Sequence, residues 1–173
     1  MSSTLWSAKI PFPPSVNGGY YENRKTFAPK FLASGKVNPR AGKAYVGRMI
    51  SIEGIAFRQE VHAIARRGHV APPFLKGRLD LLVLLCAPAE KADGTANRNR
   101  RDLDNYFKPL QDALTRAKVI SDDSLFDRVE MVRGQSVGRG EAYVLISRFD
   151  PEHVRRASAI FFPHEPARDL LST

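Results

Sequence analysis

The segment from Leu103 to Ala117 constrains the fold most, because its apolar residues recur at the spacing of a single helix face. The stripe runs i, i+4, i+7, i+11 and i+14 and consists of Leu103, Phe107, Leu110, Leu114 and Ala117. Such a stripe predicts an amphipathic helix packed on a core, regular from about Asn105 to Ala117. Pro109 is a defect unless it falls close to the first turn, because proline has no backbone N–H to donate.

Four strands are predicted, two before this helix and two after it. Residues 5–12 (LWSAKIPF) alternate and end in rigid prolines, which is typical of a short strand. Residues 78–86 (RLDLLVLLC) are rich in Leu and Val and predict a central strand that is buried on both faces. Residues 125–133 and 141–149 predict two strands that the GQSVGRG loop joins as a hairpin. The predicted fold class is α+β, a small mixed β-sheet with two main helices.

The second main helix is predicted in the N-terminal half. Residues 15–39 are rich in Gly, Asn, Lys and aromatic residues without a period, so they predict a long basic loop. From Arg40 to about Arg67 the pattern is helical, at spacings of four, three and four through Tyr45, Met49, Ile52 and Ala56. Gly47 and Gly54 weaken this helix, which a kink or close helix packing would explain.

Composition narrows the class of partner. The 173 residues carry 27 Lys and Arg against 18 Asp and Glu, a net charge of +9, which favours nucleic acid first and an acidic membrane surface second. The single cysteine, Cys86, excludes an internal disulfide and lies in an apolar run. The N-terminus lacks the pattern of a secretory signal, and the longest apolar run is far shorter than the roughly 20 residues of a membrane helix. We therefore expect a soluble cytoplasmic protein.

The chain is predicted to form one domain over residues 1–149, followed by a tail over residues 150–173. The tail begins with a capped turn at Asp150 and Pro151 and later contains the apolar sequence AIFFP. Apolar residues in a tail favour docking, so we expect this tail to lie against the body or against a second copy of the chain.

Two acidic pairs flank the predicted helix at residues 105–117. Asp102 and Asp104 lie two residues apart, so at an extended entry to the helix both carboxylates would point to one face. Carboxylates on one face repel each other unless a divalent cation or a basic neighbour neutralises them. Hard oxygen ligands at this spacing suit Mg²⁺ or Mn²⁺ better than zinc. The second pair, Asp122 and Asp123, follows the helix.

Each acidic residue also has a purely structural interpretation. Asp104 is placed to cap the helix, and it lies four residues before Lys108, at the spacing of an ordinary ion pair. Asp122 and Asp123 fit a solvated turn. The helix is roughly 20 Å long, and the six residues from Lys118 span roughly 20 Å when extended. The second pair is therefore permitted, but not forced, to return beside Asp102 and Asp104.

Four features occur together around the predicted helix: the sequence RRDLDN, Lys108 four residues after Asp104, DAL in the same helix and SDD before a strand. In these features the chain resembles the RusA family of Holliday junction resolvases. PFPPSVN near the N-terminus, a basic aromatic loop and GKAY add to the resemblance, which covers about residues 5–149 in order. Relative to compact members, the N-terminal loop is long and the tail is additional. The resemblance implies a Mg²⁺-dependent endonuclease, with Mn²⁺ as a substitute, that cuts four-way DNA junctions in recombination and repair.

The resemblance also implies residue roles. Asp102, Asp104 and Asp123 match the family's metal-binding aspartates, and Lys108 matches its essential lysine. A four-way junction is two-fold symmetric, whereas one chain carries one acidic constellation, so paired nicks require a homodimer. The implied setting is a bacterial or phage-encoded protein associated with the nucleoid.

DNA contacts are expected near the acidic residues and in the long loop. They are Arg98, Arg100, Arg101 and Asn105 near the helix, and Lys25, Tyr20 and Tyr21 in the loop. The arginines would attract phosphates and the aromatic rings would stack on bases. Alternatively, the arginines lie in a solvated loop and the tyrosines pack under it. Two other functions stay open: a metal nuclease for other branched DNA or for RNA, and a non-catalytic DNA-binding protein of the same fold.

Overall fold

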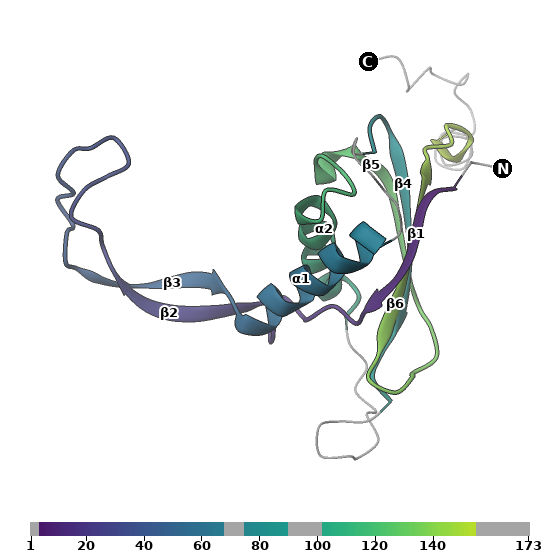
Figure 1. Ribbon diagram of the computed structural model, residues 1–173, viewed down its shortest axis with the longest axis horizontal. Helices are drawn as coiled ribbons and strands as arrows, with labels where there is room; N and C mark the ends of the chain where they lie inside the picture. The colour runs from purple at the N-terminus through teal and green to yellow at the C-terminus, as the bar shows by residue number, and fades with distance from the viewer. Residues whose placement is uncertain (1–3, 68–74, 90–101, 155–173) are drawn as a thin grey trace, which may run out of the picture.

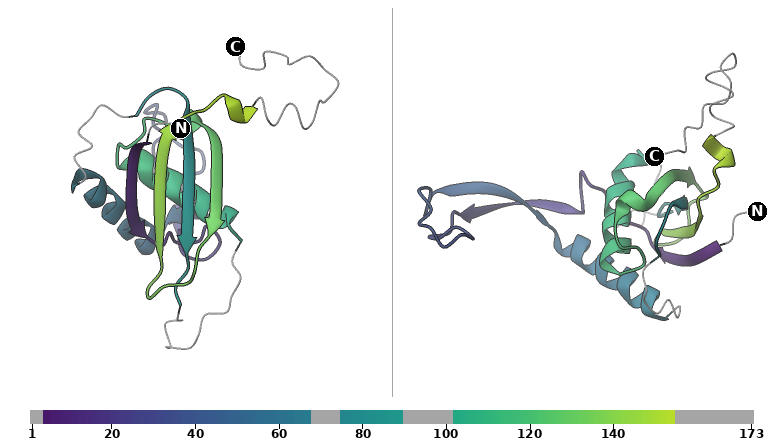
Figure 2. Two further views of the ribbon diagram at one scale, coloured as in Figure 1. Left: turned by 90° about the vertical axis from the view of Figure 1, so that its right-hand side faces the viewer. Right: turned by 90° about the horizontal axis from the view of Figure 1, so that it is seen from above.

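One four-stranded sheet, two long helices and a projecting two-stranded ribbon make up the fold. The computed structural model describes residues 4–67, 75–89 and 102–154. The four strands lie in the order β1-β6-β4-β5, and both helices pack on one face of this sheet (Figures 1 and 2). The ribbon, β2 and β3, extends away from this body (Figure 1). The predicted α+β class with a mixed sheet is confirmed.

The sheet is mixed because its strands pair in both directions. Its strands in chain order are β1 (Thr4–Pro11), β4 (Leu79–Cys86), β5 (Phe126–Arg133) and β6 (Glu141–Arg148). β6 pairs antiparallel with both β1 and β4, whereas β5 pairs parallel with β4. The predicted hairpin of β5 and β6 is therefore wrong. β4 lies between them, with Val83 opposite Met131 on one side and Val144 on the other.

The middle of the central strand is buried on only one face in the described part of the chain. Leu81 and Val83 point into the core and are almost fully buried, whereas Leu82 and Leu84 are 40% and 38% exposed. The prediction of a central strand is confirmed, but the prediction of burial on both faces is wrong at Leu82 and Leu84. The reason is that α1 and α2 cover the same side of the sheet (Figure 2).

The helix predicted from the apolar stripe is present as α2 (Asp104–Arg116). Leu110 and Leu114 are fully buried, and Leu103 and Phe107 pack against the same core. The other helix, α1 (Ile52–Arg67), buries one face against the body through Gly54, Phe57, Val61 and Ala65. After α2, a short 3-10 helix, η1 (Asp123–Leu125), leads into β5.

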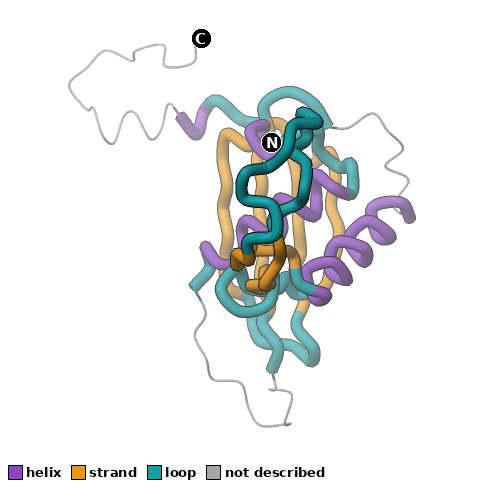
Figure 3. The backbone as a smooth tube through the Cα atoms, turned by 90° about the vertical axis from the view of Figure 1, so that its left-hand side faces the viewer, coloured by secondary structure: helices purple, strands orange, loops and turns teal. Residues whose placement is uncertain are grey.

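The ribbon replaces elements that the sequence pattern predicted differently. β2 (Tyr21–Phe27) pairs antiparallel with β3 (Ala44–Ile50), so the predicted loop is wrong at 21–27 and the predicted helix is wrong at 44–50. Phe27 and Val46 are 66% and 70% exposed. A ribbon that projects from the body has no buried face to impose alternation, so its sequence lacks the usual strand pattern. Figure 3 looks along the ribbon towards the body.

Of the two explanations considered for Gly54, a kink or close packing, the structure shows close packing. A Cβ atom there would lie 2.7 Å from the carbonyl oxygen of Tyr20 and 2.8 Å from Cγ2 of Ile50. Gly47, in contrast, lies in β3 rather than in a helix. Gly54 therefore lets α1 approach the base of the ribbon.

The start of the tail matches the expected capped turn. Asp150 Oδ1 accepts the backbone N–H of Glu152 at 3.0 Å, and helix follows at residues 152–154. The expected docking of the tail falls on residues outside the described ranges. Within those ranges, the helices are too short or too polar to cross a membrane.

Candidate functional site

The first acidic pair lies at the start of α2. Asp102 precedes the helix and Asp104 is its first residue, and both side chains are exposed. The N-cap position belongs to Leu103, so the interpretation of Asp104 as the N-cap is wrong. Asp104 Oδ1 instead accepts the N–H of Asn105 at 3.0 Å. A carboxylate in this first turn is favoured by the positive end of the helix dipole.

The second acidic pair returns to α2. The chain reverses after the helix at Lys118, whose φ of 63° is left-handed, and Val119 donates its N–H to the Leu114 carbonyl at 3.0 Å. Val119 and Ile120 are buried, which anchors the returning segment in the core. Lys108 Nζ then lies 3.2 Å from Asp123 Oδ2. The second pair therefore returns to α2 at Lys108, whereas its position beside Asp102 and Asp104 stays a prediction.

The two residues of the second pair have different environments. Asp122 Oδ1 accepts the N–H of Ser124 at 2.8 Å and so caps η1. Hydrogen bonds from Ser124 lower the pKa of the Asp122 carboxyl. Asp123 is the residue that reaches Lys108. The turn interpretation thus describes Asp122. Asp123 belongs instead to a charged cluster with Lys108 of α2.

Lys108 bridges two carboxylates. Its Nζ lies 2.8 Å from Asp112 Oδ1, four residues later on α2, as well as 3.2 Å from Asp123 Oδ2. Its ion-pair partners are therefore Asp112 and Asp123 rather than the expected Asp104. The hydrogen bond to Asp112, followed by the one to Asp123, raises the pKa of Lys108 above its ordinary value. The side chain is consequently a cation at neutral pH.

The donor chemistry of the acidic residues fits a hard divalent cation. Asp102 and Asp104 offer exposed carboxylate oxygens, and Lys108 connects Asp123 to the same helix. Oxygen donors of this kind suit Mg²⁺. Nevertheless, the described residues include no group of three or more His, Cys, Asp or Glu side chains that would hold a metal ion. In this conformation the oxygen of Asp123 faces a lysine ammonium.

Asn105 connects the start of α2 to the PPSVN segment. Asn17 Nδ2 donates to Asn105 Oδ1 at 2.7 Å, and the N–H of Val16 donates to the carbonyl oxygen of Asn105 at 2.9 Å. The side-chain oxygen of Asn105, an expected DNA contact, is thus engaged within the protein. Two motifs that are far apart in the sequence therefore meet at the acidic end of α2.

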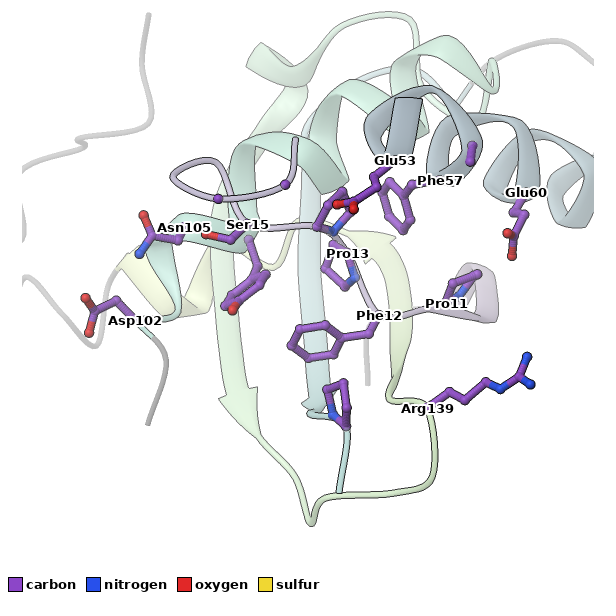
Figure 4. Close-up of a pocket in the computed structure, with 16 residues that line it drawn as sticks. Pro11, Phe12, Pro13, Ser15, Glu53, Phe57, Glu60, Asp102, Asn105 and Arg139 are labelled. Carbon is purple, nitrogen blue, oxygen red and sulfur yellow. The ribbon is translucent and has the colours of Figure 1, made fainter. Parts of the chain in front are cut away.

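An open groove of about 1000 Å³ lies beside Asp102. Figure 4 shows Asp102 and Asn105 at one end of this groove, with Glu60 and Arg139 at the other. Pro11, Phe12 and Pro13 lie between them, and Phe12 packs edge-on against Tyr106 at 4.9 Å between ring centroids. The prolines of the N-terminal motif therefore form a wall of the groove next to the acidic pair.

The loop residues expected to contact DNA have three different environments. Tyr20 is fully buried, and its hydroxyl donates to Asp112 Oδ2 at 2.9 Å, so the packing alternative describes this ring. Tyr21 is half-buried, with the Arg48 guanidinium 4.2 Å from its ring centroid. Lys25 is exposed on β2. The expected contacts Arg98, Arg100 and Arg101 lie outside the described residues.

Two residues of the cluster were not identified from the sequence. Arg58 of α1 and Asp112 of α2 form an ion pair, with Arg58 Nη2 at 3.1 Å from Asp112 Oδ2. The spacing of four between Lys108 and Asp112 was a signal for the second of these, because such residues are neighbours on a helix. Arg58 has no comparable signal, since 54 residues separate it from its partner.

The comparison with known proteins agrees with the motifs. The family model described as "Endodeoxyribonuclease RusA" matches residues 31–146, which include α2 and the segment up to Asp123. The chain is 30% identical over 141 residues to the "Crossover junction endodeoxyribonuclease rusA" of Enterobacteria phage HK97. That match covers 82% of this chain and 92% of the phage protein. The resemblance drawn from RRDLDN is confirmed, and this chain is a nuclease that belongs to the RusA family of endodeoxyribonucleases.

Proposed function

We propose that this protein resolves Holliday junctions by paired symmetric nicks, with Mg²⁺, as a homodimer that acts in DNA recombination and repair in the cytoplasm. The observation that carries the proposal is the contact of Lys108 with Asp123, because it brings the second acidic segment of the family match to the helix that begins at the first. The name of the phage relative, a crossover junction endodeoxyribonuclease, supports the choice of substrate.

Three aspartates are the proposed ligands. Asp102, Asp104 and Asp123 would hold the Mg²⁺ ion, and Mn²⁺ is expected to replace it. A bound divalent ion supplies charge that polarises a phosphoryl oxygen and favours ionisation of a water molecule. Lys108 provides a permanent positive charge beside Asp123, where it can stabilise negative charge on the scissile phosphate. Asp104, at the first turn of α2, fixes its carboxylate through the Asn105 N–H.

The ribbon is the proposed DNA-binding arm. Residues 21–50 contain seven Lys and Arg and one Glu, a net charge of +6 out of +9 for the chain. The basic residues are Arg24, Lys25, Lys30, Lys36, Arg40, Lys43 and Arg48. Phe27 and Phe31 are 66% and 53% exposed on the same arm. Basic residues interleaved with exposed aromatic rings suit phosphate contacts and base stacking.

Dimerisation follows from the geometry of the proposed substrate. Each chain carries one set of proposed site residues, which are Lys108, Asp123 and the first acidic pair, whereas a two-fold symmetric junction is cut on two strands. A symmetric homodimer would present two such sets related by the same two-fold axis. Sedimentation of the protein alone and with a four-way junction tests this part of the proposal.

A cleavage panel tests the function as a whole. Four-way junction, replication fork, flap, linear duplex and structured RNA are incubated with Mg²⁺ or with EDTA. We expect two symmetric nicks in the junction with Mg²⁺ and none with EDTA. Faster cleavage of forks, flaps or RNA would favour the alternative metal nuclease. Tight junction binding that is indifferent to Mg²⁺, without any cleavage, would favour the non-catalytic DNA-binding protein.

A further inference from the structure

The carboxylate of Asp112 is bonded through both oxygens. Oδ2 accepts the hydroxyl of Tyr20 at 2.9 Å and Nη2 of Arg58 at 3.1 Å. Arg58 Nε also donates to the Tyr20 hydroxyl at 2.7 Å, so that hydroxyl both donates and accepts. Oδ1 is left for Lys108 Nζ at 2.8 Å. Three residues from three segments therefore meet at one carboxylate.

Tyr20 and Arg58, the two partners of Asp112 Oδ2, are held in place by the surrounding fold. Tyr20 is fully buried, and its carbonyl oxygen accepts the N–H of Ser51 at 3.0 Å just before α1. The side chains of Arg58 and Asp112 are only 23% and 17% exposed. Gly54 lets α1 touch the backbone of Tyr20, which keeps Arg58 close. Asp112 is thus held by groups that cannot shift independently of the helices.

Lys108, in contrast, depends on its partners for its direction. Its side chain is 52% exposed, and a lysine stem is flexible with many rotamers. Asp112 is the fixed partner, and Asp123 Oδ2 lies 3.2 Å from the same ammonium group. We infer that Asp112, clamped by Tyr20 and Arg58, is a positioning residue that directs Lys108 Nζ to the acidic site. This inference rests on the proposed function, since it concerns the lysine of that site.

A purely structural ion pair would not need this arrangement. An exposed pair at i, i+4 is weak and contributes little to any one geometry. Here the Tyr20 and Arg58 bonds occupy Oδ2, so Oδ1 keeps one fixed direction towards Lys108. The network predicts that loss of the Asp112 charge affects cleavage only through Lys108. A structural role predicts a loss that is independent of Lys108.

The test is a double-mutant cycle on the full-length protein. Asp112→Asn, Lys108→Ala and the double variant are compared in single-turnover cleavage of a four-way junction, and binding is measured without divalent metal. We expect Asp112→Asn to slow cleavage by about tenfold or more and to change affinity less than about twofold. The double variant should cleave no more slowly than Lys108→Ala, because coupled residues are not additive.

A matched control and a second readout separate position from folding. Glu141 is bonded by Lys9 and Tyr143 at the start of β6, so Glu141→Gln removes a similar carboxylate elsewhere and should leave cleavage unchanged. The ¹⁵N NMR signal of the Lys108 ammonium group is assigned by its absence in Lys108→Ala. In the wild type its protons should be protected from exchange with water, so the signal is observed, and in Asp112→Asn the signal should be lost. An unchanged signal would contradict the inference without any use of activity.

Each outcome has a defined meaning. Wild-type cleavage rates in Asp112→Asn, or equal slowing in the presence and absence of Lys108, would overturn the inference and leave the proposed function intact. A wild type that cleaves none of the substrates would overturn both. If Asp112→Asn does not fold, the milder Tyr20→Phe takes its place. Its slowing should then disappear in the Lys108→Ala background, and slowing that persists there would count against the inference.

Discussion

The backbone N–H of Val16 donates to the carbonyl oxygen of Asn105 at 2.9 Å, and Pro109 explains why that oxygen is available. In a regular helix the N–H of residue 109 would bond this carbonyl, but proline has no N–H. The apparent defect in the apolar stripe is therefore the docking point of the PPSVN segment. It places the proline-lined groove beside the acidic start of α2 (Figure 4).

Replacement of Pro109 tests this relationship. Proline in a helix interior costs about 3 kcal/mol relative to alanine when a carbonyl is left unpaired. Because Val16 already pairs with the Asn105 carbonyl, we expect Pro109→Ala to change the free energy of unfolding by less than about 1 kcal/mol. Urea denaturation measures this directly. A gain near the full proline penalty would show that the Val16 bond does not offset it.

The two adjacent aspartates of the second pair are predicted to differ in function. Asp123→Asn should reduce Mg²⁺-dependent cleavage by about hundredfold or more, because it removes a proposed ligand beside Lys108. Asp122→Asn is the matched control, since an amide oxygen can still accept the Ser124 N–H that caps η1. Single-turnover nicking assays compare the two. Equal losses in both variants would contradict the assignment of Asp123.

The first acidic pair is expected to separate binding from cleavage. Asp104→Asn should abolish cleavage with Mg²⁺ while junction affinity is retained or increases, because a negative charge close to a phosphate is removed. Gel-shift titration and nicking assays give the two quantities. Nicking by the variant at the wild-type rate would rule out Asp104 as a ligand.

Lys108 is predicted to act on the reaction rather than on affinity. Lys108→Ala should slow cleavage by about hundredfold or more, as removal of one preorganised charge does in other active sites. Affinity for the junction should fall by only a few-fold, because about one phosphate contact is lost among many. Parallel losses in rate and affinity would instead identify Lys108 as an ordinary phosphate contact.

The ribbon is expected to contribute salt-dependent contacts. Junction affinity should fall steeply with salt, and Lys25→Gln should reduce the slope of log affinity against log salt by about one. Lys9→Gln is the control, because Lys9 is exposed on β1 and pairs with Glu141 on the body. Fluorescence anisotropy across a salt series measures both slopes. A flat response in the wild type would contradict a basic DNA-binding arm.

Alkaline titration tests the environment of Tyr20. Burial and the hydrogen bond to Asp112 raise the pKa of Tyr20 above the ordinary value of 10.0. A raised pKa in the folded state means that the stabilisation is complete below the unfolded pKa and is lost as the pH rises above it. We therefore expect the free energy of unfolding to fall above about pH 10 in the wild type and less so in Tyr20→Phe. At pH 10 the folded wild type and folded Tyr20→Phe should have the same tyrosinate absorbance. Urea should increase the absorbance more in the wild type, because unfolding exposes Tyr20.

Local patterns were enough to predict the parts of the fold in which one chain segment determines its own structure. The stripe from Leu103 to Ala117 predicted α2 to within a residue or two, because an amphipathic helix needs only one buried face. The strands after it were also placed correctly, at Phe126–Arg133 and Glu141–Arg148. The RRDLDN and SDD motifs indicated the family by residue identity alone.

Pairing between distant segments was decided by the tertiary structure. The choice of strands that flank β4 depends on hydrogen bonds to distant segments. The pairing of residues 21–27 with 44–50 leaves no periodic signal in the sequence, because the ribbon is exposed. The same holds for the clamp on Asp112, since 92 residues separate it from Tyr20. Residue types and spacings determined the candidate chemistry of this protein, whereas the direction of Lys108 follows from contacts that exist only once the chain has packed.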